Sequence, residues 1–220
     1  MQLDFHEHGA AHLRGAAAPF LSALEAIVAA LPANRAGLRL HGVVGLGELL
    51  ASSTIGAVAA ERLGGDAQPV RAILFDKSPS ANWALGWHQD RTVAVRARAD
   101  VPGYGPWSVK AGLQHVEPPF SVIDKMVTLR IHLDAVPADN APLLIAPGSH
   151  RLGKLPEAEL AEAVAQCGSA ECLAESSDIW IYATSIVHAS AAAQRQGRRR
   201  VLQVDYSAES LPPPLEWLGV

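Results

Sequence analysis

The sequence predicts one domain that is mainly β, with helical support at its N-terminal end. In residues 1–68 the apolar positions recur at three- and four-residue steps, which is typical of amphipathic helices. In residues 69–210 they form short apolar or alternating runs separated by Pro, Gly, Asn and Ser, which is typical of strands. Because no repeat, low-complexity tract or linker divides the 220 residues, we expect a single domain over 1–220.

Each expected element has its own signal. A helix over residues 16–31 ends at Pro32, and a second over 46–63 ends at Gly64-Gly65. A third helix follows Pro156 and extends to residue 165. The expected strands are residues 70–75, 92–98, 126–133, 178–182 and 201–206.

Composition limits the class of protein. The chain has 18 basic and 22 acidic residues, a net charge of −4 and 49% hydrophobic residues, which excludes disorder as the main state. The mild negative charge gives no general attraction for nucleic acid or anionic membranes, and residues 198–200 form the one obvious basic cluster. Without an export signal, a membrane-spanning run or Cys-x-x-Cys spacing at Cys167 and Cys172, we expect a cytoplasmic protein.

Two residues in the segment Trp87-His88-Gln89-Asp90 suggest a metal site. On an extended chain, residues two apart point to the same side, so His88 and Asp90 can bind one ion. His188, at the end of a strand, is the best candidate for a third ligand. Two imidazoles and a carboxylate on one side of an ion are typical of non-haem Fe(II) oxygenases. A His-x-Asp triplet also arises often by chance, so the interpretation depends on the residues around it.

Arg199 strengthens the metal interpretation. It lies eleven residues after His188 and immediately before an apolar strand. A guanidinium that enters a β core needs an anionic partner, and a carboxylate that accepts two hydrogen bonds is the natural one.

Together these features resemble the phytanoyl-CoA dioxygenase family of Fe(II)- and 2-oxoglutarate-dependent oxygenases. The resemblance covers about residues 73–206 and rests on Trp87-His88-Gln89-Asp90, Ala146-Pro147-Gly148-Ser149-His150, His188-Ala189-Ser190 and Arg199. It implies a double-stranded β-helix, a jelly-roll sandwich with its N-terminal helices packed on the outside.

The resemblance also implies roles for individual residues. His88, Asp90 and His188 would be the iron ligands, and Arg199 would pair with the distal carboxylate of 2-oxoglutarate, supported by Ser190. Residues 147–150 would form a structural turn. The implied reaction uses dioxygen, hydroxylates a small molecule and releases succinate and CO2.

Two other classes of protein stay open at this point. One is a jelly-roll protein that binds a ligand or regulates without turnover. The other is a zinc- or manganese-dependent isomerase or hydrolase on the same sandwich, which would not require Arg199.

Substrate contacts are expected from two strands and from a strand end. In residues 127–133, Arg130 lies on the polar side of an alternating pattern and would face the cavity, although a solvent-facing strand has the same pattern. Lys77 at a strand end could bind 2-oxoglutarate or substrate. Trp180, on the strand before His188, could line the cavity or belong to the core.

The segment 104–115 is expected to be a long connection that acts as a substrate lid. It carries Trp107, Lys110 and His115 soon after the metal strand. With Arg130, its Lys110 and His115 suggest an anionic substrate. The N-terminal His6, His8 and His12 lack metal-binding spacing and are expected on the surface.

Overall fold

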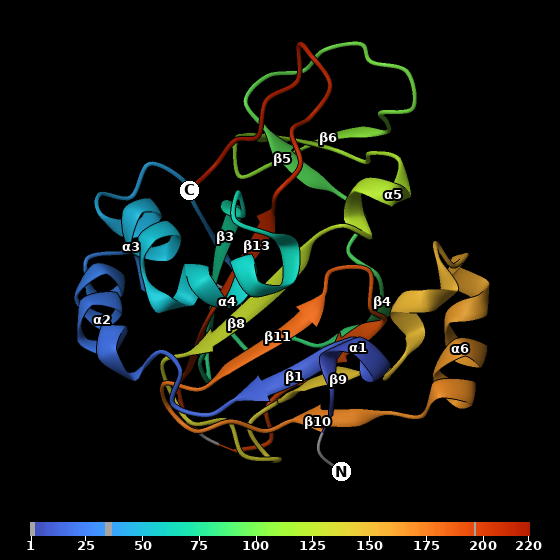
Figure 1. Ribbon diagram of the computed structural model, residues 1–220. Coiled ribbons are helices and arrows are strands. Elements are labelled where there is room, and N and C mark those ends of the chain that lie inside the picture. Colours follow the sequence, from blue (N-terminus) through green and yellow to red (C-terminus); the bar gives the residue numbers. More distant parts are fainter. Residues whose placement is uncertain (1–2, 34–36, 196) are drawn as a thin grey trace.

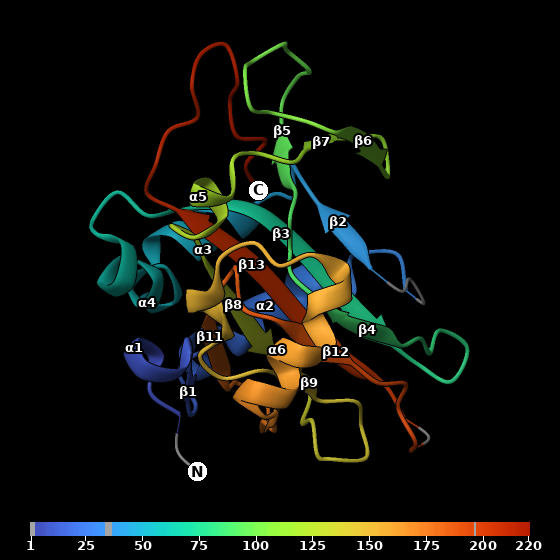
Figure 2. The ribbon, with the colours of Figure 1, turned by 90° about the vertical axis from the view of Figure 1, so that its right-hand side faces the viewer.

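A computed structural model describes residues 3–33, 37–195 and 197–220. Its centre is a sandwich of two antiparallel sheets with helices outside, as Figures 1 and 2 show from two directions. This is the jelly-roll architecture expected above, mainly β with helical support.

The larger sheet has six strands in the order β1-β11-β8-β13-β3-β2. The longest pair of neighbouring strands is β13 and β3, in which Arg199 lies opposite Lys77 and Gln203 lies opposite Ile73. The strands are β1 (Ala10–Leu13), β2 (Leu38–Leu40), β3 (Gln68–Lys77), β8 (Val127–His132), β11 (Ile179–Ala183) and β13 (Arg199–Ser207).

Two smaller sheets complete the β structure of the described residues. The second layer of the sandwich has the order β10-β9-β12-β4 and consists of β4 (Leu85–His88), β9 (Leu143–Ile145), β10 (Ala170–Cys172) and β12 (His188–Ser190). A separate sheet has the order β5-β7-β6 and consists of β5 (Val93–Val95), β6 (Trp107–Lys110) and β7 (Leu113–Val116).

Helices cover the outside of both layers. The cluster of Leu24, Leu46, Ile55 and their neighbours packs three helices on the outer face of the larger sheet, on the left of Figure 1. Another helix packs on the smaller sheet and lies in front of it in Figure 2. The helices are α1 (Phe5–His8), α2 (Leu21–Ala29), α3 (Leu46–Ser52), α4 (Thr54–Leu63), α5 (Phe120–Ile123) and α6 (Leu160–Cys167), with 3-10 turns at Ala18–Phe20, Ser149–Leu152 and Glu157–Glu159.

The expected helix over 46–63 is two helices. Ser53 has extended backbone angles, and its hydroxyl accepts a hydrogen bond from the N–H of Ile55 at 3.1 Å, which caps α4. A serine that bonds its own backbone competes with a continuous helix. The chain can therefore bend here, and both helices reach the sheet. The helix expected over 16–31 is likewise shorter, because a 3-10 turn over Ala18–Phe20 precedes α2.

The first 68 residues are not helical throughout. The strands β1 and β2 form the two edges of the larger sheet, beside β11 and β3 respectively. Both are too short for alternation to be visible in the sequence. The expected strand over 92–98 is also limited to β5.

The segment 104–115 is not an irregular loop. Most of it forms the hairpin β6-β7, whose apolar side packs on Leu211, Leu215 and Trp217 near the C-terminal end. Among the described helices none has the length and hydrophobicity to cross a bilayer. Cys167 and Cys172 are both unpaired.

Candidate metal and cosubstrate site

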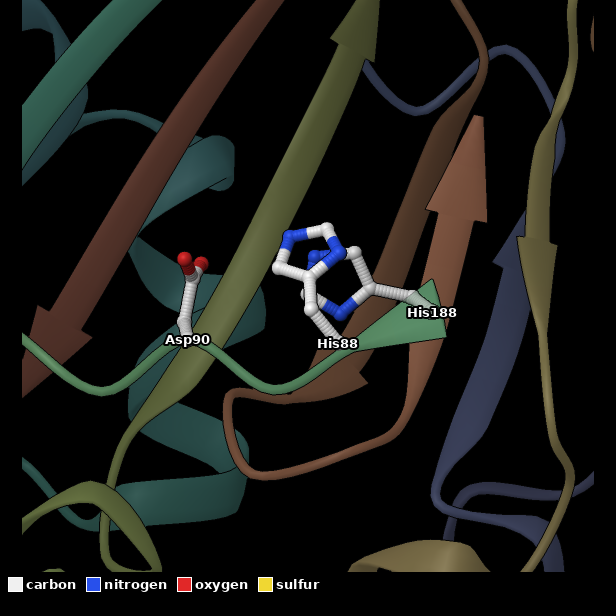
Figure 3. A group of neighbouring side chains, drawn as sticks. All are labelled: His88, Asp90 and His188. Carbon is white, nitrogen blue, oxygen red and sulfur yellow. The ribbon is translucent and has the colours of Figure 1, made fainter. Parts of the chain in front are cut away.

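The structure brings His88, Asp90 and His188 together. One ligand atom from each lies within 4.8 Å of the other two, close enough for the three side chains to share a divalent ion. His88 ends β4 and His188 begins β12, and these residues are paired in the smaller sheet, with ring centroids 4.2 Å apart. Figure 3 shows the imidazoles side by side, with the Asp90 carboxylate on the same side of the chain that continues from β4.

Hydrogen bonds orient both imidazoles. Nδ1 of His88 lies 2.8 Å from the carbonyl oxygen of Gly86, and Nδ1 of His188 lies 3.0 Å from that of Ile186. A carbonyl can only accept, so each Nδ1 carries a proton, and in the neutral ring Nε2 then has the lone pair that a metal needs. This is the usual arrangement of metal-binding histidines. Burial, with His88 close by, lowers the pKa of His188 to about 4, so its imidazole is neutral at pH 7.

Gln89 holds the two ligands beside it in place. Because it alternates with them, its side chain points to the opposite side, where it is buried. Its amide nitrogen donates to the carbonyls of Gly153 and Ser185, and its amide oxygen accepts from the N–H of Leu155. The metal strand is thereby tied to the segment that leads into His188.

Arg71, which the sequence did not identify, sets the charge of Asp90. Its guanidinium donates to the Asp90 carboxylate at 3.2 Å and also pairs with the buried Asp205. Burial alone would raise the pKa of Asp90, but the positive charge of the adjacent Arg71 holds it below its ordinary value. Asp90 is therefore a carboxylate at neutral pH.

The three side chains open into a cavity of about 210 Å³ against the inner face of the larger sheet. Alternate residues of the sheet point into it, including Lys77 from β3, Arg130 from β8 and Arg199 from β13. Their neighbours along each strand, such as Leu129 and Leu202, face the helices instead. Arg130 is buried rather than solvent-facing, and it donates to Oε1 of Gln203 at 2.9 Å.

Arg199 is buried, and none of the described carboxylates pairs with it. It is 2% exposed, and its guanidinium donates to the carbonyl oxygen of Ala141. Its Nε has no hydrogen-bond partner among the described residues. Burial and then the nearby Arg130 lower the pKa of Arg199 to about 9, which still leaves it charged at pH 7.

Lys77 and Ser190 lie beside Arg199 in the same cavity. The Lys77 ammonium is also buried, and it donates to the carbonyls of Trp83 and Ala191 and to the Ser190 hydroxyl. Burial, followed by Arg199 and Arg130, lowers the pKa of Lys77 to about 7.

The residues expected to contact substrate separate into two groups. Lys110 and Arg130 line the cavity. Trp107 instead packs in the cluster around β5 and β7, and His115 is buried with Nδ1 bonded to the carbonyl of Leu113. Trp180 stacks on His12 and lines a different groove, next to β1.

The N-terminal histidines are not all surface residues. His12 is partly buried and bonds Asp178 at 2.8 Å. Its partner lies 166 residues away, so only the pairing of β1 with β11 brings them together. The turn expected over 147–150 is present after β9, and there the Ser149 hydroxyl accepts from the N–H of Val187, directly before His188.

Arg39 is a second cavity residue that the sequence did not identify. It comes from the edge strand β2, in the segment expected to be helical. Arg71, by contrast, lies in the expected strand 70–75. It is six residues before Lys77, and residues an even number of positions apart on a strand face the same side, so this spacing could have identified it.

These residues fit an iron ion and a dicarboxylic acid. Two imidazoles and one carboxylate form the donor set that suits non-haem Fe(II). The buried guanidinium of Arg199, with an unpartnered Nε, suits a carboxylate that accepts two hydrogen bonds. Both features open into the same cavity.

Comparison with known proteins agrees with this geometry. A family model described as phytanoyl-CoA dioxygenase (PhyH) matches residues 45–201. No curated protein sequence matches the chain significantly.

Solved structures resemble the whole chain. EctD from S. alaskensis with bound Fe has a TM-score of 0.66 at 18% identity, with 98% of this chain and 78% of that chain covered. AviO1 from Streptomyces viridochromogenes Tue57 has a TM-score of 0.64 at 20% identity, covering 95% and 94%. HygX from Streptomyces hygroscopicus, with nickel, 2-oxoglutarate and hygromycin B bound, has a TM-score of 0.63 at 12% identity, covering 92% and 84%. At these identities the likeness establishes the shared fold.

Proposed function

The chain belongs to the phytanoyl-CoA dioxygenase family, and on that basis we propose that it is an Fe(II)- and 2-oxoglutarate-dependent oxygenase that hydroxylates a small molecule. One observation carries the proposal. A three-donor metal set and a buried arginine, which has no carboxylate partner in the described part of the chain, open into the same cavity.

In this proposal His88, Asp90 and His188 hold the iron from one side. Bound iron would supply the activation of dioxygen and the redox chemistry that side chains lack. Nε2 of each imidazole and an oxygen of Asp90 are the ligand atoms. The Nδ1 hydrogen bonds keep both rings in that orientation, and Arg71 keeps Asp90 ionised.

Arg199 holds the distal carboxylate of 2-oxoglutarate. Its charge is costly to bury alone, and an incoming carboxylate offsets that cost through two charge-assisted hydrogen bonds. Ser190 borders the same end of the cavity, where its hydroxyl accepts from Lys77 and can donate to the carboxylate. Across the reaction, one oxygen atom of O2 would enter succinate and the other the hydroxylated substrate, and 2-oxoglutarate would lose its first carboxylate as CO2.

The alternatives explain fewer of these features. A zinc or manganese hydrolase would use the three donors but would have no need of a buried Arg199. A jelly-roll protein without turnover would have no need of both features together. The two unpaired cysteines agree with a reducing cytoplasm, which we propose as its location.

Anaerobic titration of the protein with Fe(II) and then 2-oxoglutarate tests the proposal. We expect a weak visible charge-transfer band that requires both additions, and succinate release once air and a substrate are supplied. Metal binding without any response to 2-oxoglutarate would support a hydrolase or isomerase instead. No metal binding at all would support the non-catalytic alternative.

A further inference from the structure

The cavity contains more positive charge than 2-oxoglutarate requires. Six cationic side chains line it, and Asp90 is the one carboxylate among its described lining residues. Arg71 pairs with Asp90 and Asp205. The other five cations have no carboxylate partner within the described chain: Arg39, Lys77, Lys110, Arg130 and Arg199.

These five cations form two groups. Lys77, Arg130 and Arg199 influence one another and lie at the end proposed for 2-oxoglutarate. Arg39 and Lys110 line the cavity on the side of Arg71 and Asp90 instead. Lys110 donates to Thr92, whose carbonyl accepts from Arg71, and Arg71 in turn pairs with Asp90. Arg39 is paired with Ile73, two residues from Arg71 on β3. The first group is sufficient for the distal carboxylate of 2-oxoglutarate, whose other carboxylate would lie at the metal. The second group therefore lacks a counter-charge.

Arg39 has no acceptor of its own. Its Nε is buried and unpartnered, and no ion pair or hydrogen bond joins its guanidinium to any residue in the ranges that the structure describes. A buried donor without a partner costs free energy, so a ligand that supplies an acceptor there gains affinity.

Lys110 approaches the same place from a different sheet. It ends β6, and its ammonium donates to the Thr92 hydroxyl at 3.0 Å, while the Thr92 carbonyl accepts from Arg71 at 3.2 Å. Thr92 thus positions Lys110 beside the metal strand. The Lys110 ammonium has three N–H donors, and two of them have no acceptor among the described residues and can serve a ligand.

Building on the proposed function, we propose that Arg39 and Lys110 bind an oxyanion group of the substrate, a carboxylate or a phosphate, on the Asp90 side of the metal. A planar guanidinium and a compact ammonium together suit either oxyanion. The cavity of about 210 Å³ is smaller than the roughly 300–1,000 Å³ of sites for drug-sized ligands, so the part of the substrate held inside it is small.

Calorimetry with four small probes tests this site. The protein is first saturated with Fe(II) and 2-oxoglutarate without oxygen, and then titrated with phenyl phosphate, phenylacetate, inorganic sulfate or neutral benzyl alcohol. We expect at least one anionic probe to bind about tenfold or more tightly than benzyl alcohol. The tighter of phenyl phosphate and phenylacetate identifies the oxyanion.

Two substitutions on different sheets test the residues themselves. Arg39→Gln and Lys110→Gln should each weaken the preferred anion by about tenfold to a hundredfold, with the Kd of 2-oxoglutarate unchanged. Arg96→Gln is the control, because Arg96 is an exposed arginine that pairs with Glu216 away from the cavity. It should leave both affinities unchanged.

Three results would overturn the anion site. The first is that no anionic probe binds more tightly than benzyl alcohol, and the second is that the anion affinity is unchanged in both variants. The third is that the variants lose as much affinity for 2-oxoglutarate as for the anion, which would make Arg39 and Lys110 part of the cosubstrate site. Titrating the metal-free protein separates the two proposals. The protein could bind the anion through Arg39 and Lys110 and yet bind neither iron nor 2-oxoglutarate. That result would refute the proposed oxygenase activity but support the anion site.

Discussion

The two faces of the larger sheet are both buried, yet they differ in what fills them. The outer face carries Leu129, Leu202 and other apolar side chains packed against the helices. The inner face carries Arg130, Arg199 and Gln203 against a cavity. Buried apolar groups stabilise the fold, whereas buried charges cost free energy unless something pairs with them. The outer face thus serves stability, and the inner face keeps its unpaired cations for ligands.

The same contrast separates two consecutive residues of β13. Arg199 faces the cavity, where its acceptor is a backbone carbonyl. Arg200 faces the other way, and two of its side-chain nitrogens donate to the Asp134 carboxylate. One of them, Nη2, also donates to Oε1 of Glu25 in α2 at 3.3 Å. One arginine keeps donors for a ligand, and the other joins strand to helix.

The largest effect is expected at the metal ligands. His188→Ala should reduce succinate formation to background and abolish Fe(II) binding detected by calorimetry, because two donors hold a divalent ion weakly. The fold should persist, and His41→Ala, at an exposed position, is the control. Unchanged succinate yield in His188→Ala would contradict the assignment of the ligands.

The outer face should affect stability alone. Leu129 is fully buried against the helices, so Leu129→Ala should lower the free energy of unfolding by about 2–5 kcal/mol, measured by urea denaturation. The Kd of 2-oxoglutarate for the folded protein should not change. If that Kd rises in proportion to the loss of stability, the two faces are not independent.

Arg199 and Arg200 give the sharpest test of the comparison. Arg199→Lys should raise the Kd of 2-oxoglutarate by about thirtyfold, because a lysine cannot offer two parallel donors. Iron affinity should change little. Arg200→Lys should leave the Kd unchanged and lower stability by about 1 kcal/mol, since the pair with Asp134 is partly exposed. The reverse pattern would mean that the wrong arginine has been assigned to the cosubstrate.

A pH dependence of stability, rather than of activity, is expected from His132. This imidazole is buried on the inner face near Arg130, Arg199, Asp178 and His12, and burial followed by the two arginines lowers its pKa to about 3. Below its unfolded pKa of about 6.5, the unfolded chain binds a proton that the folded protein does not. Stability should therefore fall as the pH falls from about 6.5 towards 3.

His132→Gln removes this contribution. Over that range the slope of the unfolding free energy against pH should decrease by up to about 1.4 kcal/mol per pH unit, measured by urea denaturation at several pH values. An unchanged slope would mean that His132 titrates alike in the folded and unfolded protein. His41→Gln, at an exposed position, serves as the control.

Much of this protein was predictable from local patterns. The alternation in β8 separated Leu129 from Arg130, and the spacing of His88 and Asp90 indicated two ligands on one side, because strand geometry imposes a period of two. The family resemblance and the distance from His188 to Arg199 singled out His188, Ser190 and Arg199, which line the same cavity.

Tertiary structure decided what depends on contacts distant in sequence. The short edge strand β2 carries Arg39 to the cavity through its pairing with β3, and no periodicity is visible in three residues. The hairpin β6-β7 brings Lys110 to the cavity and turns Trp107 into a cluster near the C-terminal end. A sequence pattern records which side of a strand a residue occupies. Which charges then share a cavity depends on how sheets and chain segments pack. Here that packing places Arg39 and Lys110 in the cavity that Asp90 lines, without a carboxylate partner among the described residues.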